Sequence, residues 1–278
     1  MSETRRRHTS TASSATADFV VPRRRPIVLG NWKMNKTTTQ AVVLAQDISN
    51  HYYRDYDRVE TVLCPPFIDL KSVANVLEFD RSALRLGAQD VYWEESGAYT
   101  GAISPAMLVE VGCAYCIVGH SERRGLFGET DRDVNRKVQA LLSAGISPVI
   151  CVGEGAATRE AGERPTQEFI AGQLEAAFEG VGASGAARSV VAYEPIWAIG
   201  TGRTATPEQA QEICAQIRGR ISERYGHATA QAVRLVYGGS VKPENVGFFV
   251  QMPDLDGCLA GGAALDAPAF IELVKAFL

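Results

Sequence analysis

A regular alternation of short apolar runs with amphipathic stretches most constrains the fold of this 278-residue chain. The runs are β-branched or apolar on both faces, which is typical of parallel strands covered by helices. Strands are expected at residues 27–30, 59–64, 84–88, 115–119, 148–151, 190–193, 234–237 and 257–259. Helices are expected between them at 38–52, 131–143, 166–178, 207–225 and 267–277, with a shorter one opening at 242–244.

Eight such alternations predict an α/β fold, a single-domain (β/α)8 barrel spanning residues 26–278. A doubly wound open sheet is the alternative. It is disfavoured because no G-x-G-x-x-G follows the first run and no G-x-x-x-x-G-K-[ST] occurs in the chain. The alternation gives no sign of a second domain.

Residues 1–25 differ from the rest. They hold six arginines and eight Ser or Thr, with only Glu3 and Asp18 as acids. We expect a disordered extension on a cytoplasmic protein. An Arg- and Ser-rich, acid-poor start also resembles an organellar transit peptide, so import remains the alternative.

Composition narrows the range of partners and cofactors. The net charge of −4 argues against nucleic acid or an anionic membrane, and no apolar run approaches the roughly 20 residues that span a bilayer. The six cysteines are scattered; Cys113 and Cys116 have zinc-like spacing but no second pair to complete a site. We expect reduced, buried thiols, no metal and no cofactor.

Candidate catalytic side chains follow the expected strands, where barrel enzymes carry their chemistry. Asn31 and Lys33 follow the first strand, and two-residue spacing on an extended segment predicts that they face the same side. His120 follows the fourth strand and Glu194 the sixth. Taken singly, each has a plain alternative: a surface lysine, a structural histidine or a solvated loop glutamate.

Glycines follow the last two strands, as Gly238-Gly239-Ser240 and Gly261-Gly262. Such pairs most often mark tight turns, but loops after strands seven and eight of a barrel commonly bind phosphate through backbone N–H groups. Carboxylate, imidazole, ammonium and an uncharged phosphate cradle together favour cofactor-free proton transfer beside the carbonyl of a small phosphorylated sugar.

These motifs resemble the triosephosphate isomerase family over about residues 26–278. The resemblance rests on Gly30-Asn31-Trp32-Lys33-Met34-Asn35, Cys64-Pro65-Pro66-Phe67, Gly97-Ala98-Tyr99-Thr100-Gly101, Ile117-Val118-Gly119-His120-Ser121-Glu122-Arg123-Arg124, Cys151-Val152-Gly153-Glu154, residues 193–202, Tyr237-Gly238-Gly239-Ser240-Val241 and Gly261-Gly262-Ala263.

The resemblance implies interconversion of dihydroxyacetone phosphate and glyceraldehyde 3-phosphate, a step of glycolysis and gluconeogenesis. It implies that Glu194 is the base and His120 a neutral electrophile, the family being a known example of such pKa tuning. Ser121 would begin the helical turn after His120. Lys33 and Asn31 would stabilise charge on the substrate oxygens, with Glu122 as the buried partner of Lys33.

The resemblance also implies a closing lid, which keeps water from a reactive enediolate. Its residues would be Pro195, Ile196, Trp197, Ala198, Ile199, Gly200, Thr201 and Gly202. The phosphate would be held at Gly200, Ser240, Gly261 and Gly262, together with Asn31 and Lys33.

Residues 89–102 resemble the family's protruding loop, which implies a homodimer. Gln89 would begin that loop, and Thr100 would lie beside Asn31 and Lys33 of the partner subunit. Three residues depart from the family pattern: Asp90, Ala102 and Ala264. Ala102 stands where an acid is usual, so Arg123 is expected to lack a partner across the interface.

Two other functions remain open from the sequence. A related isomerase of a four-carbon sugar phosphate would keep the same base, imidazole and lysine with an altered pocket. A non-catalytic phosphate-binding scaffold would need the glycine loops but has no use for all four of Asn31, Lys33, His120 and Glu194.

Overall fold

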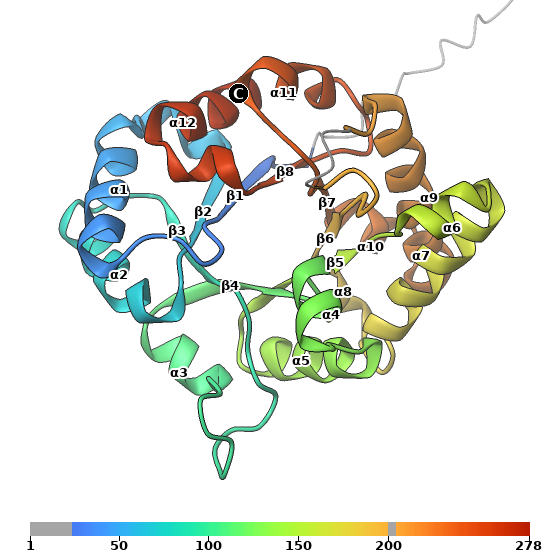
Figure 1. Ribbon diagram of the computed structural model, residues 1–278, viewed down its shortest axis with the longest axis horizontal. Coiled ribbons are helices and arrows are strands. Elements are labelled where there is room, and N and C mark those ends of the chain that lie inside the picture. Colours follow the sequence, from blue (N-terminus) through green and yellow to red (C-terminus); the bar gives the residue numbers. More distant parts are fainter. Residues whose placement is uncertain (1–23, 200–203) are drawn as a thin grey trace, which may run out of the picture.

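The computed structural model describes residues 24–199 and 204–278 and forms a closed barrel of eight parallel strands (Figure 1). The strands are β1 (Ile27–Asn31), β2 (Glu60–Cys64), β3 (Arg85–Ala88), β4 (Cys113–Val118), β5 (Ser147–Val152), β6 (Val190–Tyr193), β7 (Arg234–Tyr237) and β8 (Gly257–Ala260). They follow the order of the sequence, and β8 pairs in parallel with β1 to close the barrel. The predicted (β/α)8 architecture is confirmed.

Helices surround the barrel (Figure 1). They are α1 (Thr38–His51), α2 (Leu70–Phe79), α3 (Pro105–Glu110), α4 (Ser121–Phe127), α5 (Asp131–Ser143), α6 (Ala156–Glu160), α7 (Glu163–Ala177), α8 (Ala183–Ala187), α9 (Pro207–Tyr225), α10 (His227–Ala232), α11 (Pro243–Val250) and α12 (Ala267–Ala276), with short 3-10 turns at Arg54–Arg58, Phe67–Asp69 and Gly262–Leu265.

Most predicted boundaries lie close to the observed ones. The bounds of α5, α9, β6 and β7 are as predicted. In contrast, β4 begins two residues before the predicted start, because Cys113 pairs with Leu86 across a shift in register. Helix α7 begins at Glu163 rather than at residue 166. Pro165 fits there because the first turn of a helix has no acceptor for its N–H groups.

Two apolar layers hold the barrel together. Ile27 and Leu29 of β1 pack inside the barrel with side chains such as Ile117, while Val28 packs against the helices outside. This alternation explains why the strand runs are apolar on both faces. Apolar side chains of the inner layer fill the barrel, and the polar side chains described below lie at the ends of the strands.

Ion pairs lie at the amino ends of the strands, opposite the cavity described below. Asp256, just before β8, pairs with Arg24 at 2.6 Å and with Arg218 of α9 at 2.9 Å. Residues 1–23, the bulk of the expected extension, lie outside the described residues, whereas Arg24 already contacts the barrel. All six cysteines are unpaired and buried, as expected.

No helix in the part of the chain that the structure describes is long and apolar enough to cross a membrane.

Candidate active site

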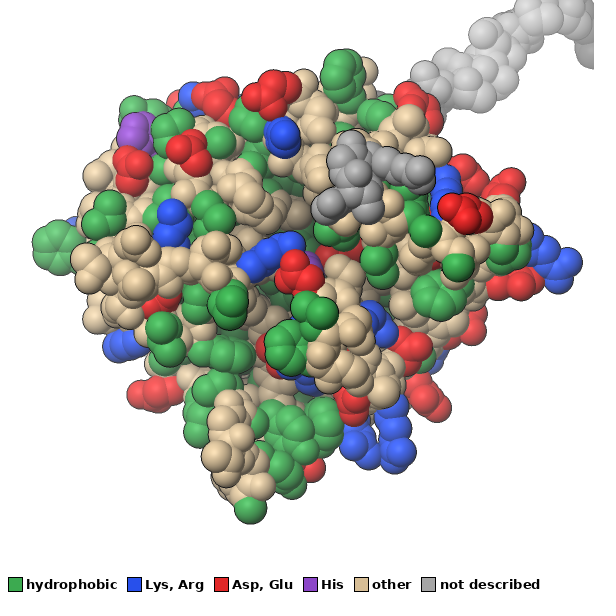
Figure 2. Space-filling view, viewed as in Figure 1, with side chains coloured by type: hydrophobic (Ala, Val, Ile, Leu, Met, Phe, Trp, Pro, Cys, Tyr) green, Lys and Arg blue, Asp and Glu red, His purple; other side chains and the backbone are tan. Residues whose placement is uncertain are grey.

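A cavity of about 640 Å³ opens at the carboxyl ends of the strands. It is lined by residues that follow β1, β4, β6, β7 and β8, among them Asn31, Lys33, His120, Glu122, Glu194, Ile199, Ser240, Gly261 and Gly262. Figure 2 shows basic, acidic and histidine side chains together in the centre of this face. The structure therefore gathers most of the catalytic and phosphate-binding residues expected from the sequence into one hollow.

Asn31 and Lys33 both line the cavity, but not because an extended segment directs their side chains to the same side, as the spacing predicts. Strand β1 ends at Asn31, and Lys33 adopts left-handed backbone angles with φ +53°. The Asn31 side chain accepts a hydrogen bond from the Lys33 N–H at 3.0 Å, and Gln89 donates to the Lys33 carbonyl at 2.9 Å. These two contacts hold a sharp turn that directs Lys33 into the cavity.

The Lys33 ammonium pairs with Glu122, whose Oε1 lies 2.6 Å from Nζ. The expectation of a buried Glu122 is wrong for this chain, because its side chain is 43% exposed. It stands on the first turn of α4, at the rim of the cavity. The pairing holds Lys33, but water can screen it in part.

His120 and Glu194 meet on the cavity wall. His120 Nε2 lies 3.0 Å from Glu194 Oε1, and the backbone N–H of Ser121 donates to Glu194 Oε2 at 2.9 Å. The side chains are 7% and 2% exposed, respectively. Both carboxylate oxygens are therefore in contact with residues at the start of α4.

The protonation of His120 reflects opposing effects. Burial lowers its pKa, but the hydrogen bond and charge of Glu194, with the charge of Glu122, raise the pKa overall. At the same time, the Glu122 N–H donates to His120 Nδ1 at 3.2 Å, so Nδ1 carries a lone pair and Nε2 carries the proton of the neutral ring. The contact with Glu194 thus favours a charged ring, and the helix terminus favours a neutral one.

Two glycines make room for Glu194. A Cβ on Gly153, after β5, would lie 1.7 Å from the Glu194 carbonyl oxygen, and a Cβ on Gly238 would lie 2.9 Å from Glu194 Cγ. Any side chain at Gly153 would push the Glu194 backbone away. Sequence reasoning assigned no role to Gly153, although its place directly after a strand, next to Glu154, was an available signal.

Glu154 is a second residue that sequence reasoning did not assign. Its side chain is fully buried, and its Oε1 accepts hydrogen bonds from Trp197 Nε1 at 2.9 Å and from Tyr193 OH at 3.1 Å. Tyr193 and Trp197 flank Glu194 and Pro195 in the chain. Glu154 therefore holds the first part of the expected lid, up to Trp197. Gly200, Thr201 and Gly202 of that lid lie outside the described residues.

The segment between β3 and α3 protrudes from the barrel (Figure 1) and carries Thr100, which is exposed. Arg123, which the sequence predicts to lack an acid from the partner subunit because of Ala102, has one within its own chain. Asp90 lies 2.7 Å from Arg123 Nη2, so an acid in the same chain pairs with this guanidinium. Among residues 24–199 and 204–278, no cluster of three or more His, Cys, Asp or Glu could hold a metal ion.

Comparison with known proteins agrees with this geometry. The family model described as triosephosphate isomerase matches residues 26–277. A triosephosphate isomerase of Caldanaerobacter subterraneus is 47% identical over 252 residues, covering 91% of this chain and 99% of the relative. That of a Thermoanaerobacter species is 49% identical and covers 91% of this chain and 99% of the relative. That of Corynebacterium efficiens is 45% identical and covers 90% of this chain and 95% of the relative. The chain belongs to the triosephosphate isomerase family.

Proposed function

We propose that this protein interconverts dihydroxyacetone phosphate and D-glyceraldehyde 3-phosphate by proton transfer through an enediolate, a reaction of glycolysis and gluconeogenesis. The observation that carries the proposal is the meeting of Glu194 and His120, 3.0 Å apart, in a cavity that also holds the Lys33 ammonium. A base, a proton donor and a cation are the groups that proton abstraction beside a carbonyl requires.

Glu194 acts as the base. It takes a proton from the carbon next to the substrate carbonyl, and the electron pair of that C–H bond forms the carbon–carbon double bond of the enediolate. The same carboxyl then returns the proton to the neighbouring carbon. Without substrate, the Glu194 oxygens contact His120 and the Ser121 N–H. The carboxylate leaves these two contacts when it turns to the substrate. Gly238 leaves space for that movement.

His120 and Lys33 stabilise the negative charge that develops on the substrate oxygens. His120 presents Nε2–H toward the cavity because Nδ1 is occupied by the Glu122 N–H. Lys33 supplies a positive charge held by Glu122. The Asn31 amide accepts a hydrogen bond from the Lys33 backbone N–H and lines the same cavity. Donors fixed before the reaction are most effective where water is excluded.

The phosphate group occupies the side of the cavity lined by Ser240, Gly261 and Gly262, where backbone N–H groups are the available donors. A Cβ on Gly261 would lie 3.3 Å from Lys33 Cε, so a glycine lets the lysine stem pass close to this turn. The lid, residues 195–202 with Gly200 as a further phosphate contact, closes over the substrate and excludes water.

An assay of the purified protein tests the function. We expect turnover of glyceraldehyde 3-phosphate, with little turnover of a four-carbon analogue, and a fall in kcat of about 10²–10⁴-fold in Glu194→Gln. Glu168→Gln, on an exposed carboxylate of α7, is the matched control and should keep full activity. Full activity in Glu194→Gln would remove Glu194 from the mechanism, and inactivity of the wild type on both sugars would favour a binding scaffold.

We also propose that the active form is a homodimer. The protruding segment with Thr100 supports this, as do the exposed apolar side chains of Met34, Ile68 and Phe127, which follow β1, β2 and β4 in the chain. Sedimentation with activity measured at the same protein concentrations is the test. An active monomer at micromolar concentration would contradict insertion of the loop into a partner.

A cytoplasmic location is supported by six unpaired cysteines, which are typical of reducing compartments. Organellar import through residues 1–25 would instead remove part of the extension. Mass spectrometry of the mature amino terminus, with cell fractionation, distinguishes the two.

A further inference from the structure

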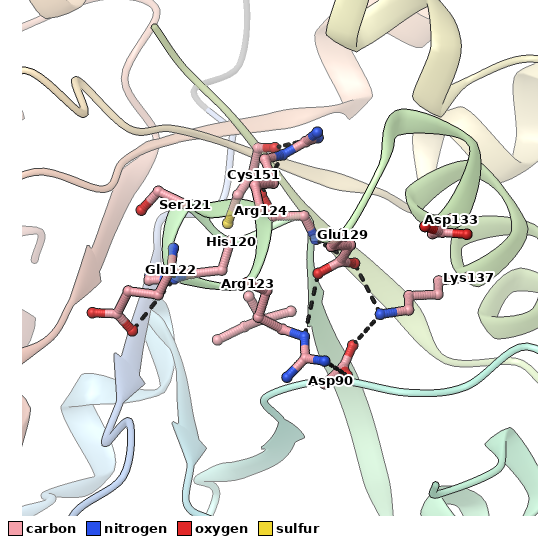
Figure 3. Close-up of polar contacts among 12 residues, drawn as sticks. Asp90, His120, Ser121, Glu122, Arg123, Arg124, Glu129, Asp133, Lys137 and Cys151 are labelled. Atoms are coloured by element: carbon pink, nitrogen blue, oxygen red, sulfur yellow. Dashed lines mark hydrogen bonds and ion pairs between the residues drawn. The ribbon is translucent and has the colours of Figure 1, made fainter. Parts of the chain in front are cut away.

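Four charged side chains, two of them buried, form a closed ring beside His120 (Figure 3). Asp90 contacts Arg123 at 2.7 Å and Lys137 at 2.6 Å, and Glu129 contacts the same two cations at 3.2 Å and 2.9 Å. Acids and bases alternate around the ring. We call Asp90, Arg123, Glu129 and Lys137 the charge quartet.

The charge quartet is costly to bury. The side chains of Glu129 and Lys137 are 3% and 6% exposed, and burial raises the pKa of Asp90 even though Lys137 and Arg123 oppose that rise. Buried ion pairs are often neutral for stability when compared with apolar side chains, whereas they can specify one arrangement of the elements that carry them. Its geometry therefore needs a reason besides stability.

The quartet reaches the candidate active site through Gly119, the residue before His120. Glu129 Oε1, already paired with Lys137, accepts a hydrogen bond from the Gly119 N–H at 3.2 Å. On the other side, Arg124 Nε donates to the Gly119 carbonyl at 2.7 Å. Gly119 has φ +71°, so these contacts fix a turn that few other residues could adopt. The position of Glu129 thus sets the position of His120.

Asp90 connects the quartet to the other half of the site. Its neighbour Gln89 donates to the carbonyls of Lys33 and Cys64, each at 2.9 Å. Arg123, the cation that Asp90 holds, follows Glu122 in α4, and Glu122 pairs with Lys33. Residues 89 and 90 therefore contact both the turn that carries Lys33 and the helix that follows His120.

We propose that Asp90 is a positioning residue for the reaction: by holding Arg123 and Lys137, its carboxylate fixes Glu129, and through Gly119 it fixes His120 relative to Lys33. This inference rests on the proposed function in so far as His120 acts on the substrate. Both acids of the charge quartet contact Arg123 from within the same chain.

Asp90→Asn keeps the shape of the side chain and removes its charge. We expect kcat to fall about tenfold with KM within about twofold, because a displaced His120 stabilises the transition state less well while the phosphate contacts remain. The ¹⁵N resonances of the His120 ring should shift. Asp254→Asn is the matched control, since it also takes a carboxylate from a buried arginine, Arg218, but at the opposite end of the barrel. It should lower stability and leave kcat and the His120 resonances unchanged.

A charge-balanced double variant, Asp90→Asn with Lys137→Gln, separates positioning from stability. It removes one acid and one base and leaves the Arg123–Glu129 pair, so its melting temperature should exceed that of Asp90→Asn, in which two cations face one acid, while kcat stays low. Recovery of kcat as well, or an Asp90→Asn variant with wild-type kcat and unshifted His120 resonances, would overturn the proposal. If the wild type does not isomerise triose phosphates, the proposed function fails, but the His120 resonances still decide the coupling to Asp90.

Discussion

In the proposed mechanism, Glu194 at rest favours a charged His120 ring, whereas the ring must be neutral when the substrate proton is taken. The carboxylate contributes a hydrogen bond and a negative charge, and both raise the pKa of an imidazole whose burial would lower it. When Glu194 turns to the substrate, that support is withdrawn and burial dominates. Movement of the base therefore helps to keep the imidazole neutral during proton abstraction.

Glu194→Gln tests this coupling at a single residue. The amide has no charge, so we expect the pKa of His120 to be lower than in the wild type in a ¹⁵N NMR titration of the ring. The stability effect has a definite sign. A histidine whose pKa is raised on folding adds stability that is full below its unfolded pKa, about 6.5, and lost as pH rises through the folded value. The variant should therefore lose more stability, relative to wild type, at pH 5.5 than at pH 8. An unchanged or higher His120 pKa would contradict the coupling.

Among secondary-structure elements, the ends of β5 and β6 fit together without space for a side chain. Gly153 after β5 lies against the backbone of Glu194 after β6, and the Glu194 N–H donates to Val152 at 2.8 Å. The two strand ends therefore place the base as a unit. Any displacement of one strand end moves the carboxylate on the other.

Gly153→Ala should lower kcat by about 100-fold, because the added Cβ would sit 1.7 Å from the Glu194 carbonyl oxygen and shift the base by a fraction of an ångström or more. Gly155→Ala, two residues along, is the matched control, since a methyl group added there would meet nothing within 4 Å. Steady-state kinetics with circular dichroism to verify folding provides the measurement. Equal kcat in both variants would show that Glu194 is positioned from elsewhere.

Elements with a clear apolar run or amphipathic pattern were predictable from the sequence, and the fine geometry was not. Strands and helices such as β6, β7, α5 and α9 have enough periodicity to define their own ends. Helix α4 has only seven residues and is held by tertiary contacts, such as Arg124 with the Cys151 carbonyl. The pairing of Asp90 with Arg123 joins residues far apart in the chain, and no sequence spacing specifies it. The exposure of Glu122 likewise depends on how the residues at the rim of the cavity pack, which no sequence spacing specifies.

Across the whole molecule, the two ends of the barrel hold different kinds of polar side chain. The carboxyl end carries the cavity and its candidate catalytic groups. The amino end carries Asp256, which accepts from Arg24, from Arg218 and from the N–H of Leu235. Changes at the amino end should therefore affect stability rather than turnover.

Asp256→Asn should lower the free energy of unfolding by about 3–5 kcal/mol, because Arg24 loses its charged partner and the buried Arg218 keeps only Asp254. The rate constant kcat should stay unchanged at temperatures where the variant is folded. Denaturant unfolding and initial rates on the same preparation measure both. Asp47→Asn, on an exposed pair in α1, serves as control with an expected change within about 0.5 kcal/mol. A large loss of kcat in folded Asp256→Asn would show that the two ends are coupled.

Closure of the barrel by β1 and β8 also has a consequence for synthesis of the chain. Ile27 pairs with Gly257, so β1 is synthesised well before β8, one of its two neighbours. Until residue 260 has emerged, β1 presents an unpaired edge, and the inner apolar layer lacks one wall. The native topology of the barrel is therefore completed only after β8 has been made, when the most distant pairing in the barrel forms. The nascent chain passes through an open, edge-exposed sheet that the finished enzyme never shows.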